Sequence, residues 1–279
     1  MADVILEVTD AELQSITQSV LIRYGIDFTC YEPKYLKRRI IRVLNIFELN
    51  STYELWVKLL RDPKFVYTFM NEVSVGMTSM FRDPILWNHL KSRIAESYWD
   101  KPIIDIWHAG CSTGEEVFTM AILLKEINFL NKARSIATDF NHNALSVAQQ
   151  GLYHKIKMIE NEANYKTYNQ WGEFGKYYQR EVNDCVMDNS LITHVKYSYQ
   201  NLITEAAPSP RLFDTIFCRN VMIYFDTKAK QNLLTKFFSA LKPGGLFIIG
   251  FFDTMSHLID SKQFELIDEQ AKIFKKVAL

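Results

Sequence analysis

The sequence predicts an α/β protein in which a doubly wound, mostly parallel sheet follows an all-helical N-terminal region. Four short apolar runs rich in β-forming residues are separated by helical stretches, at residues 103–107, 135–139, 213–218 and 246–251. This alternation is typical of a parallel sheet with helices on both faces. No strand pattern occurs before residue 100, so the preceding part of the chain is expected to be helical.

The composition is that of an ordinary globular protein. The 279 residues are 48% apolar and 23% charged, and 32 basic residues balance 32 acidic ones, which gives no reason to expect nucleic acid. No run approaches the roughly 18 apolar residues that would span a bilayer, and the first residues do not resemble a signal peptide. We therefore expect a cytoplasmic protein without membrane insertion, in which four widely spaced cysteines are reduced.

The N-terminal helical domain is expected to span residues 1–75. Apolar residues recur there at helical spacing, and residues that cap helices precede the runs. Three helices are expected, from a cap at Thr9 or Asp10 to Gly25, from about Pro33 to Phe47, and from Ser51, in a capping box with Glu54, to about Asp62.

The second of these helices carries a row of positive charges. Lys34, Arg38 and Arg42 recur every four residues on its predicted outer side, with Lys37 and Arg39 beside them. Such a face is more often solvated surface than a binding site. It could also steer an acidic partner, because the patch is local even though the whole chain is neutral.

A turn of seven residues, Gly110-Cys-Ser-Thr-Gly-Glu-Glu116, lies between an apolar run at 102–109 and a helical stretch at 117–127. Strand, small-residue turn and helix let backbone N–H groups approach a ligand closely. The turn lacks the lysine of a Walker loop and the glycine spacing of a dinucleotide fingerprint. The next strand ends in Asp139, at the spacing of an acid that binds both ribose hydroxyls of an adenosine cofactor. This combination favours S-adenosylmethionine over a nucleotide.

The sheet domain is expected over residues 101–279, with an interruption in its middle. Residues 151–200 are rich in tyrosine, asparagine and charge, and they predict one or two helices and then a small inserted antiparallel β unit at about 172–200. Lys242-Pro-Gly-Gly245 is expected to turn tightly into the fourth strand. The alternating residues 272–277 are expected to add a closing edge strand.

Further segments make the pattern more specific. They are Thr78-Ser-Met-Phe-Arg-Asp-Pro84, Asn201-Leu202, the run from Phe213 to Asp226 that contains Cys-Arg-Asn-Val-Met-Ile-Tyr-Phe, and Leu241-Lys-Pro-Gly-Gly245. With the glycine turn, their order and spacing resemble the bacterial chemotaxis receptor methyltransferases, over nearly the whole chain. The resemblance implies a fold of the S-adenosylmethionine-dependent methyltransferase type and methyl ester formation on glutamate side chains of chemoreceptors.

The resemblance also implies roles for individual residues. Glu116 and Asp139 match residues that hold the amino-acid and ribose ends of the cofactor, and residues 76–100 match a linker segment that closes over it. Arg82 and Tyr224 match two residues beside the transferred methyl and are the expected catalytic pair. The expected cofactor residues are Thr78, Arg82, Gly110, Glu116, Asp139, Asn201, Leu202, Asn220 and Val221. Docking on the acidic methylation region of the receptor is expected through Lys34, Arg38, Arg39 and Arg42.

Methyl transfer to a glutamate makes modest chemical demands. The sulfonium charge activates the methyl, and an ionised carboxylate is a competent nucleophile, so no general base is needed. The enzyme must supply in-line positioning and a dry site. The forked donors of Arg82 could hold one carboxylate oxygen while the other attacks, and Tyr224 could donate a hydrogen bond or form a wall.

Plainer interpretations of the same residues stay open. Without the resemblance, Arg82 beside Asp83 would indicate an ion pair at a helix end, and Tyr224 a core tyrosine. The histidines show no ligand spacing, so no metal site is expected. The protein is expected to be a monomer.

The chain departs from the family pattern at several places, two of which could affect the site. Gly76 stands where family members usually carry asparagine, and Gly250-Phe-Phe-Asp253 where they typically read Gly-His-Ser-Glu. Phe251 and Phe252 either line a different substrate pocket or simply pack. Two rival hypotheses therefore remain, a non-catalytic cofactor-binding scaffold or sensor and a methyltransferase that acts on another protein.

Overall fold

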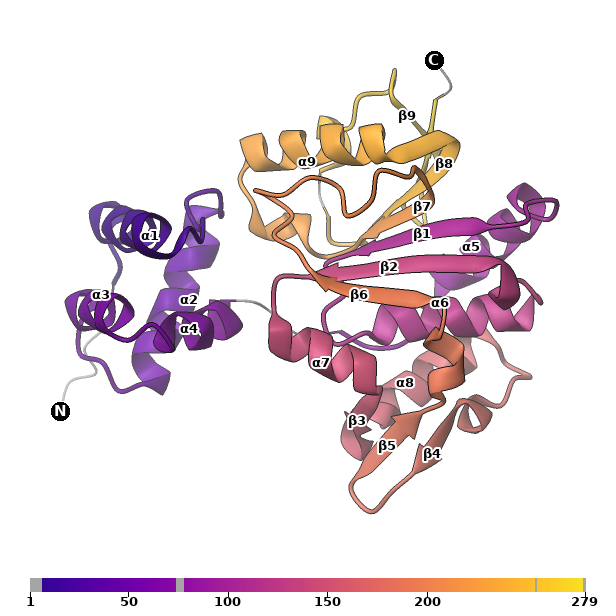
Figure 1. Cartoon of the computed structure of the whole chain (residues 1–279), viewed down its shortest axis with the longest axis horizontal. Coiled ribbons are helices and arrows are strands. Elements are labelled where there is room, and N and C mark those ends of the chain that lie inside the picture. The colour runs from indigo at the N-terminus through magenta and orange to yellow at the C-terminus, as the bar shows by residue number, and fades with distance from the viewer. Residues whose placement is uncertain (1–6, 74–77, 254, 278–279) are drawn as a thin grey trace. The chain divides into compact units, whose positions relative to one another are not determined.

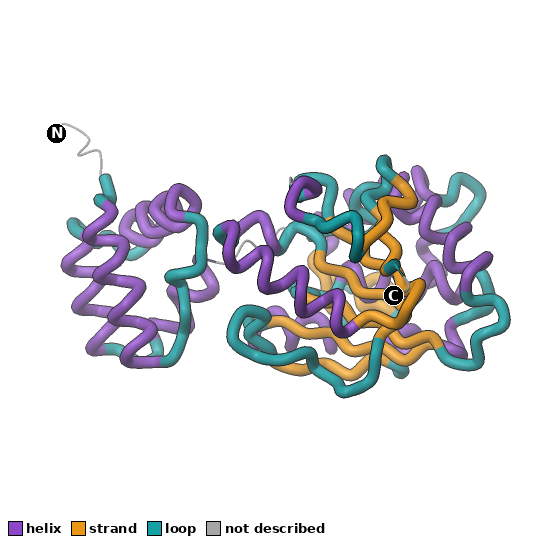
Figure 2. The backbone as a smooth tube through the Cα atoms, turned by 90° about the horizontal axis from the view of Figure 1, so that it is seen from above, coloured by secondary structure: helices purple, strands orange, loops and turns teal. Residues whose placement is uncertain are grey.

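A computed structural model describes residues 7–73, 78–253 and 255–277. The chain divides into two compact units. The helical unit consists of Met1–Val75 with Tyr224–Gln231, and the sheet unit of Gly76–Ile223 with Asn232–Leu279. Figure 2 shows helices joined by loops in the helical unit, whereas the sheets belong to the sheet unit.

The helical unit confirms the three predicted helices and adds a fourth. They are α1 (Asp10–Tyr24), α2 (Pro33–Ile46), α3 (Thr52–Arg61) and α4 (Phe65–Val73). Thr9 caps α1 in a complete capping box, since its N–H donates to the Glu12 carboxylate at 2.8 Å and its hydroxyl accepts the Glu12 N–H. The box predicted at Ser51 is half formed, because the Glu54 carboxylate accepts from the N–H of Asn50 instead.

The segment Tyr224–Gln231 packs with the N-terminal helices. The ring of Tyr224 lies 4.6 Å from that of Tyr35, and its carbonyl accepts the Glu32 N–H at 2.9 Å. The predicted range 101–279 of the sheet domain differs from the structure at this segment. In the sequence, Tyr224 and Phe225 continue an apolar run. Nothing there indicated that the segment packs with the N-terminal helices and not with the sheet unit.

The main sheet has seven strands in the order β6-β2-β1-β7-β8-β10-β9 (Figure 1). Their bounds are β1 (Ile104–Ala109), β2 (Ala133–Asp139), β6 (Val195–Tyr199), β7 (Phe213–Cys218), β8 (Leu241–Ile249), β9 (Phe264–Asp268) and β10 (Ile273–Lys276). The first five in the order are parallel, and β10 is antiparallel to both its neighbours. The doubly wound, mostly parallel sheet is confirmed, but the edge strand is β9, and β8 begins before the predicted turn at 242–245.

The sheet unit also contains α-helices of 9 to 14 residues and several short 3₁₀ helices. The α-helices are α5 (Pro84–Ser97), α6 (Glu115–Glu126), α7 (His142–Gln150), α8 (Lys155–Tyr168) and α9 (Thr227–Ala240), the last starting in the segment grouped with the helical unit. The 3₁₀ helices are η1 (Leu130–Lys132), η2 (Phe174–Tyr177), η3 (Asn189–Ile192), η4 (Met222–Tyr224) and η5 (Ser256–Leu258). None of the described helices is long and apolar enough to cross a membrane.

A small antiparallel sheet of order β3-β5-β4 is the inserted unit. It is built from β3 (Leu152–His154), β4 (Tyr178–Arg180) and β5 (Asp184–Met187). The predicted range 172–200 therefore misses β3 and includes β6, which pairs with β2 in the main sheet. The half-buried Glu126 carboxylate ties this region to α6, since it accepts the hydroxyls of Tyr165, Tyr168 and Tyr177 at 2.7, 2.9 and 3.3 Å.

Candidate functional site

The predicted cofactor residues from Gly110 onward gather at the carboxyl ends of the parallel strands of the sheet unit. The chain runs from β1 to β2 and β6, then returns to β7 on the other side of β1 (Figure 1). Such a reversal leaves a crevice beyond the carboxyl ends of the two central strands, where open α/β sheets bind ligands. The residues that follow β6, β2, β1 and β7 therefore line one edge in that order.

The glycine turn crosses this reversal point. Gly110 has φ +80°, and a Cβ at this position would lie 2.5 Å from Cγ2 of Val221 in the loop after β7. The N–H groups of Gly110 and Cys111 both donate to the Thr138 carbonyl at the end of β2, at 2.8 and 2.9 Å. The turn thus connects β2 and β7 across β1, and residue 110 must be glycine for the backbone to pass.

Asp139 ends β2 as predicted, and its carboxylate is fixed by two backbone donors. One oxygen accepts the Ser112 N–H at 2.8 Å, and the other accepts the Asn141 N–H at 2.9 Å. Burial raises the pKa of Asp139 above its ordinary value, although these hydrogen bonds oppose the shift. Each carboxylate oxygen keeps a further lone pair, as an acid that accepts two ribose hydroxyls requires.

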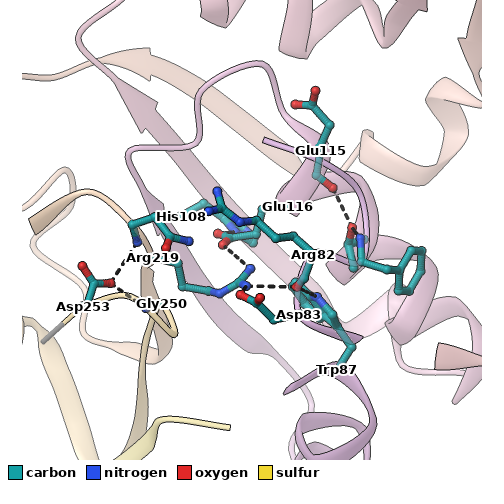
Figure 3. A network of polar contacts seen from close by, with 12 residues as sticks. Arg82, Asp83, Trp87, His108, Glu115, Glu116, Arg219, Gly250 and Asp253 are labelled. Carbon is teal, nitrogen blue, oxygen red and sulfur yellow. Dashed lines mark hydrogen bonds and ion pairs between the residues drawn. The ribbon is translucent and has the colours of Figure 1, made fainter. Parts of the chain in front are cut away.

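Glu116, at the start of α6, is held by a histidine and an arginine (Figure 3). Its carboxylate contacts Nδ1 of His108 at 3.0 Å and accepts from Nη1 of Arg219 at 3.2 Å. Burial alone would raise the pKa of Glu116, but the two partners outweigh it and hold the pKa below its ordinary value. Glu116 is therefore ionised at neutral pH and suited to binding a ligand ammonium group.

Arg219 links Glu116 to the segment before α5. Its Nη2 donates to the Asp83 carboxylate at 2.8 Å and to the main-chain carbonyl of Arg82 at 3.0 Å, and Trp87 Nε1–H donates to the same carbonyl at 2.9 Å (Figure 3). Asp83 thus pairs with Arg219, and α5 begins rather than ends here. Neither Arg219 nor His108 was predicted as a site residue from the sequence. A charged residue at the end of a buried apolar strand was the signal for Arg219.

The segment that carries Thr78 and Arg82 is anchored to the sheet unit by its backbone. The N–H of Met80 donates to Asn161 at 2.8 Å, and the N–H of Phe81 donates to Thr119 at 2.9 Å. Thr78 and Arg82 themselves are half-buried. The segment is thus preformed beside the start of α6. Gly76 lies outside the described residues.

Asn201 and Leu202 follow β6, at the far end of the same edge. Asn201 Oδ1 accepts the Ile203 N–H at 2.9 Å, and Leu202 is buried. Tyr224 and the basic face of α2 belong to the helical unit. Their roles beside the cofactor and the acceptor stay predictions.

Asn220, after β7, is held in a left-handed conformation by Asp253. Its φ is +56°, and its N–H donates to Asp253 Oδ2 at 2.9 Å. The Gly250 N–H donates to the same oxygen at 2.6 Å (Figure 3). Among the described residues, Asp253 Oδ1 and Asn220 Oδ1 are buried without a hydrogen-bond partner. Burial raises the pKa of Asp253 to about 6.

We expect the Asp253→Asn variant to gain stability over the wild type as the pH rises. An aspartate ordinarily titrates near pH ~4, so between about pH 4 and 6 the folded chain keeps a proton that the unfolded chain releases. Wild-type stability therefore falls through this window, by roughly 2–3 kcal/mol. Asparagine can still accept both N–H groups through one oxygen. Urea unfolding at pH steps from about 4 to 7 checks this, and a difference between the proteins that does not change with pH would contradict it.

The chain matches family models of known proteins over nearly its whole length. The fold and the site define a cofactor-binding α/β domain with a glycine turn after its first strand and an acid after its second. The family model described as CheR methyltransferase, SAM binding domain matches residues 76–273, and the model of the CheR methyltransferase all-alpha domain matches residues 11–74. The chain belongs to the CheR methyltransferase family, and its cofactor is S-adenosylmethionine.

Curated relatives align along nearly their whole length. The putative methyltransferase Cher3 of Pseudomonas putida is 31% identical over 268 residues, which cover 96% of this chain and 97% of that protein. Chemotaxis protein methyltransferases of Borreliella burgdorferi and Salmonella typhimurium are 29% and 28% identical, with 90% and 91% of this chain and 90% and 87% of those proteins covered.

The residues of the sheet unit fit S-adenosylmethionine. The fixed carboxylate of Asp139 suits the ribose hydroxyls, and the ionised Glu116 suits the ammonium group. The unpartnered Oδ1 of Asn220 is a buried acceptor at the same edge. A buried acceptor without a protein donor is costly in the absence of a ligand or water, so it marks a place where a ligand donor fits.

Proposed function

We propose that this methyltransferase esterifies glutamate side chains in the cytoplasmic methylation region of chemoreceptors, as a protein-glutamate O-methyltransferase. The names of the relatives from Borreliella and Salmonella support a role in chemotaxis. The observation that carries the chemical part is the placement of Arg82. Two buried donors, from Trp87 and Arg219, hold its main-chain carbonyl at the edge where Glu116 lies.

The residues divide the work in a way that suits a carboxylate acceptor. Bound S-adenosylmethionine supplies a methyl group on a positively charged sulfur. Asp139 orients it from the end of β2 and Glu116 from the start of α6, and the Arg82 guanidinium holds the acceptor carboxylate in its ionised form. Tyr224 walls the methyl or donates a hydrogen bond in this proposal. Positioning and exclusion of water carry the rate, because an ionised carboxylate needs no base.

Alkali-labile labelling tests the proposal. The protein is incubated with methyl-labelled S-adenosylmethionine and a chemoreceptor cytoplasmic fragment, and the product is treated with base. A glutamate ester releases volatile labelled methanol, whereas N-methyl groups do not. A fragment whose methylation-region glutamates are replaced by alanine is the control. Label that resists base, or label on both fragments alike, would overturn the proposed acceptor.

The basic face of α2 is the proposed docking surface. Lys34, Arg38 and Arg42 are exposed, while Tyr35 and Leu36 on the opposite side are buried. Arg42 is partly neutralised by Glu72 at 3.3 Å. Lys37 pairs with Asp10 at 2.7 Å, whereas Lys34 and Arg38 form no ion pair with the described carboxylates. An acidic partner therefore gains most at Lys34 and Arg38.

Charge reversal at Lys34→Glu with Arg38→Glu is expected to raise KM for the receptor fragment roughly tenfold, because steering and rim contacts act mainly on encounter. The kcat and the affinity for S-adenosylhomocysteine should not change. The effect should shrink as salt is raised from 0.05 to 0.5 M, estimated from a screening length of about 10 Å at 0.1 M. Arg61→Glu with Lys64→Glu, the same charge change on exposed residues around the end of α3, is the control. Equal effects from the two pairs would show that net charge alone matters.

A further inference from the structure

The loop after β8 presents two phenylalanines to solvent. Phe251 and Phe252 are 60% and 59% exposed, and their rings meet edge to face with centroids 5.5 Å apart. They fill the central positions of a turn that the Asp253 N–H closes on the Gly250 carbonyl at 3.1 Å. Central turn positions usually carry small or polar residues. The exposure contradicts the interpretation that these side chains simply pack in the core.

This turn is rigidly anchored. The buried Asp253 carboxylate binds the Gly250 N–H and the Asn220 N–H together. A Cβ at residue 250 would lie 2.6 Å from Asn220 Oδ1, so the two loops are in close contact. Exposure of two apolar rings to water is unfavourable, and on this turn the rings contribute little packing to the fold. Such an exposed apolar patch indicates a binding surface.

The two rings form one wall of a cavity of about 320 Å³. Ile85 and Leu86 at the start of α5 form another wall, and Lys272 in the turn between β9 and β10 closes the rim. The cavity also touches Asp83, which accepts from Arg219 at 2.8 Å. The cavity is therefore continuous with the polar network that holds Arg82 and Glu116.

The strand order places the cavity on the acceptor side. The ribose-binding acid Asp139 follows β2, Glu116 follows β1 and Asn220 follows β7, so the cofactor residues run across the sheet toward β8. The Phe251–Phe252 turn follows β8 itself, one strand beyond. The adenosine end of the cofactor is therefore expected near the ends of β2 and β6, away from the Phe251–Phe252 turn. A protein that brings a carboxylate to the methyl must approach from a side that the adenosine leaves open.

We infer that this cavity receives an apolar side chain of the acceptor protein, next to the glutamate that is methylated, and so selects which glutamates are modified. The inference rests on the proposed function. When the cavity holds the apolar residue, the carboxylate of the neighbouring glutamate is positioned beside Arg82, because both side chains belong to one rigid helix or strand of the acceptor. Recognition therefore combines an apolar contact at Phe251 and Phe252 with charge at Arg82.

The test replaces both rings, as Phe251→Ser with Phe252→Ser, and measures methylation of a chemoreceptor cytoplasmic fragment. Loss of one apolar contact is worth about 10- to 100-fold in kcat/KM. We expect a loss of that size, with unchanged affinity for S-adenosylhomocysteine by calorimetry. Ile103→Ser with Leu212→Ser is the matched control, since both residues are exposed and precede β1 and β7 at the opposite edge. Its kcat/KM should stay at the wild-type level.

A second arm changes the acceptor. Each apolar residue beside a methylated glutamate of the fragment is replaced by serine, and one such change should cost the wild-type enzyme as much as the ring variant loses. Combined with the ring variant, it should cost nothing more. Wild-type kinetics in the ring variant, or additive losses for every position, would overturn the inference while the proposed function stands. Absence of a base-labile ester with the wild-type enzyme would instead overturn the proposed function, and the inference with it.

Discussion

Replacing Arg82 by alanine is expected to lower kcat for receptor methylation by about 10²- to 10³-fold, the usual cost of removing one preorganised charged donor from a reacting group. The segment should keep its place, because the buried donors Trp87 and Arg219 bind the main-chain carbonyl of residue 82. Alanine supplies the same carbonyl. The variant therefore separates the chemistry of the guanidinium from the structure around it.

Single-turnover kinetics and unfolding by urea check this expectation together. The free energy of unfolding should stay within about 1 kcal/mol of the wild type, because the main-chain contacts that anchor residue 82 are kept. Arg82→Lys should recover part of the rate, because a point charge replaces a forked donor. Normal turnover by Arg82→Ala with bound cofactor would remove Arg82 from the catalytic residues and favour an indirect role.

The Asp139→Asn variant is expected to bind S-adenosylhomocysteine about 10- to 100-fold more weakly, because hydrogen bonds to a charged acceptor contribute about 1.5–3 kcal/mol. It should also be less stable by about 1–3 kcal/mol. Both carboxylate oxygens accept backbone N–H groups, from Ser112 and Asn141. An amide places its own NH₂ against one of these donors, which leaves that donor unpaired.

Calorimetry and urea unfolding measure the two effects, and Asp188→Asn is the control. The Asp188 carboxylate accepts the N–H of Ser190, two residues further along the chain, just as Asp139 accepts that of Asn141. Asp188 directly follows the small sheet, however, and not β2. The control should leave cofactor affinity unchanged. Unaltered affinity in Asp139→Asn as well would mean that the acid after β2 serves the glycine turn and not the ribose.

The predictions from sequence succeeded where the pattern was local. Short apolar runs bounded by turns predicted β7 at its observed bounds. A cap at Thr9 or Asp10 and an end at Gly25 were predicted for α1, and Thr9 and Gly25 are the observed caps. The position of Asp139 at the end of β2 could be predicted because an acid at a strand end follows a glycine turn at a known spacing. Each of these depends on residues close together in the chain.

The parts that were missed depend on contacts between distant segments. Alternation in β6 gives no indication that it pairs with β2 instead of the small sheet. The role of Arg219 arises only when the loop after β7 meets Asp83 and Glu116. Similarly, Asp253 could not be connected with Asn220 before the order of β7 and β8 was known.

The shared carboxylate of Glu126 makes the attachment of the small sheet visible to ultraviolet absorbance. Burial, together with the nearby Glu126 charge, raises the pKa of Tyr165, Tyr168 and Tyr177 above the ordinary value, for Tyr177 to about 12. Free tyrosines ionise near pH ~10, so above that pH the folded chain holds protons that a detached small sheet would release. Detachment of the small sheet therefore becomes more favourable as the pH rises. It also ionises these tyrosines, and the phenolates that form are detected by their ultraviolet absorbance.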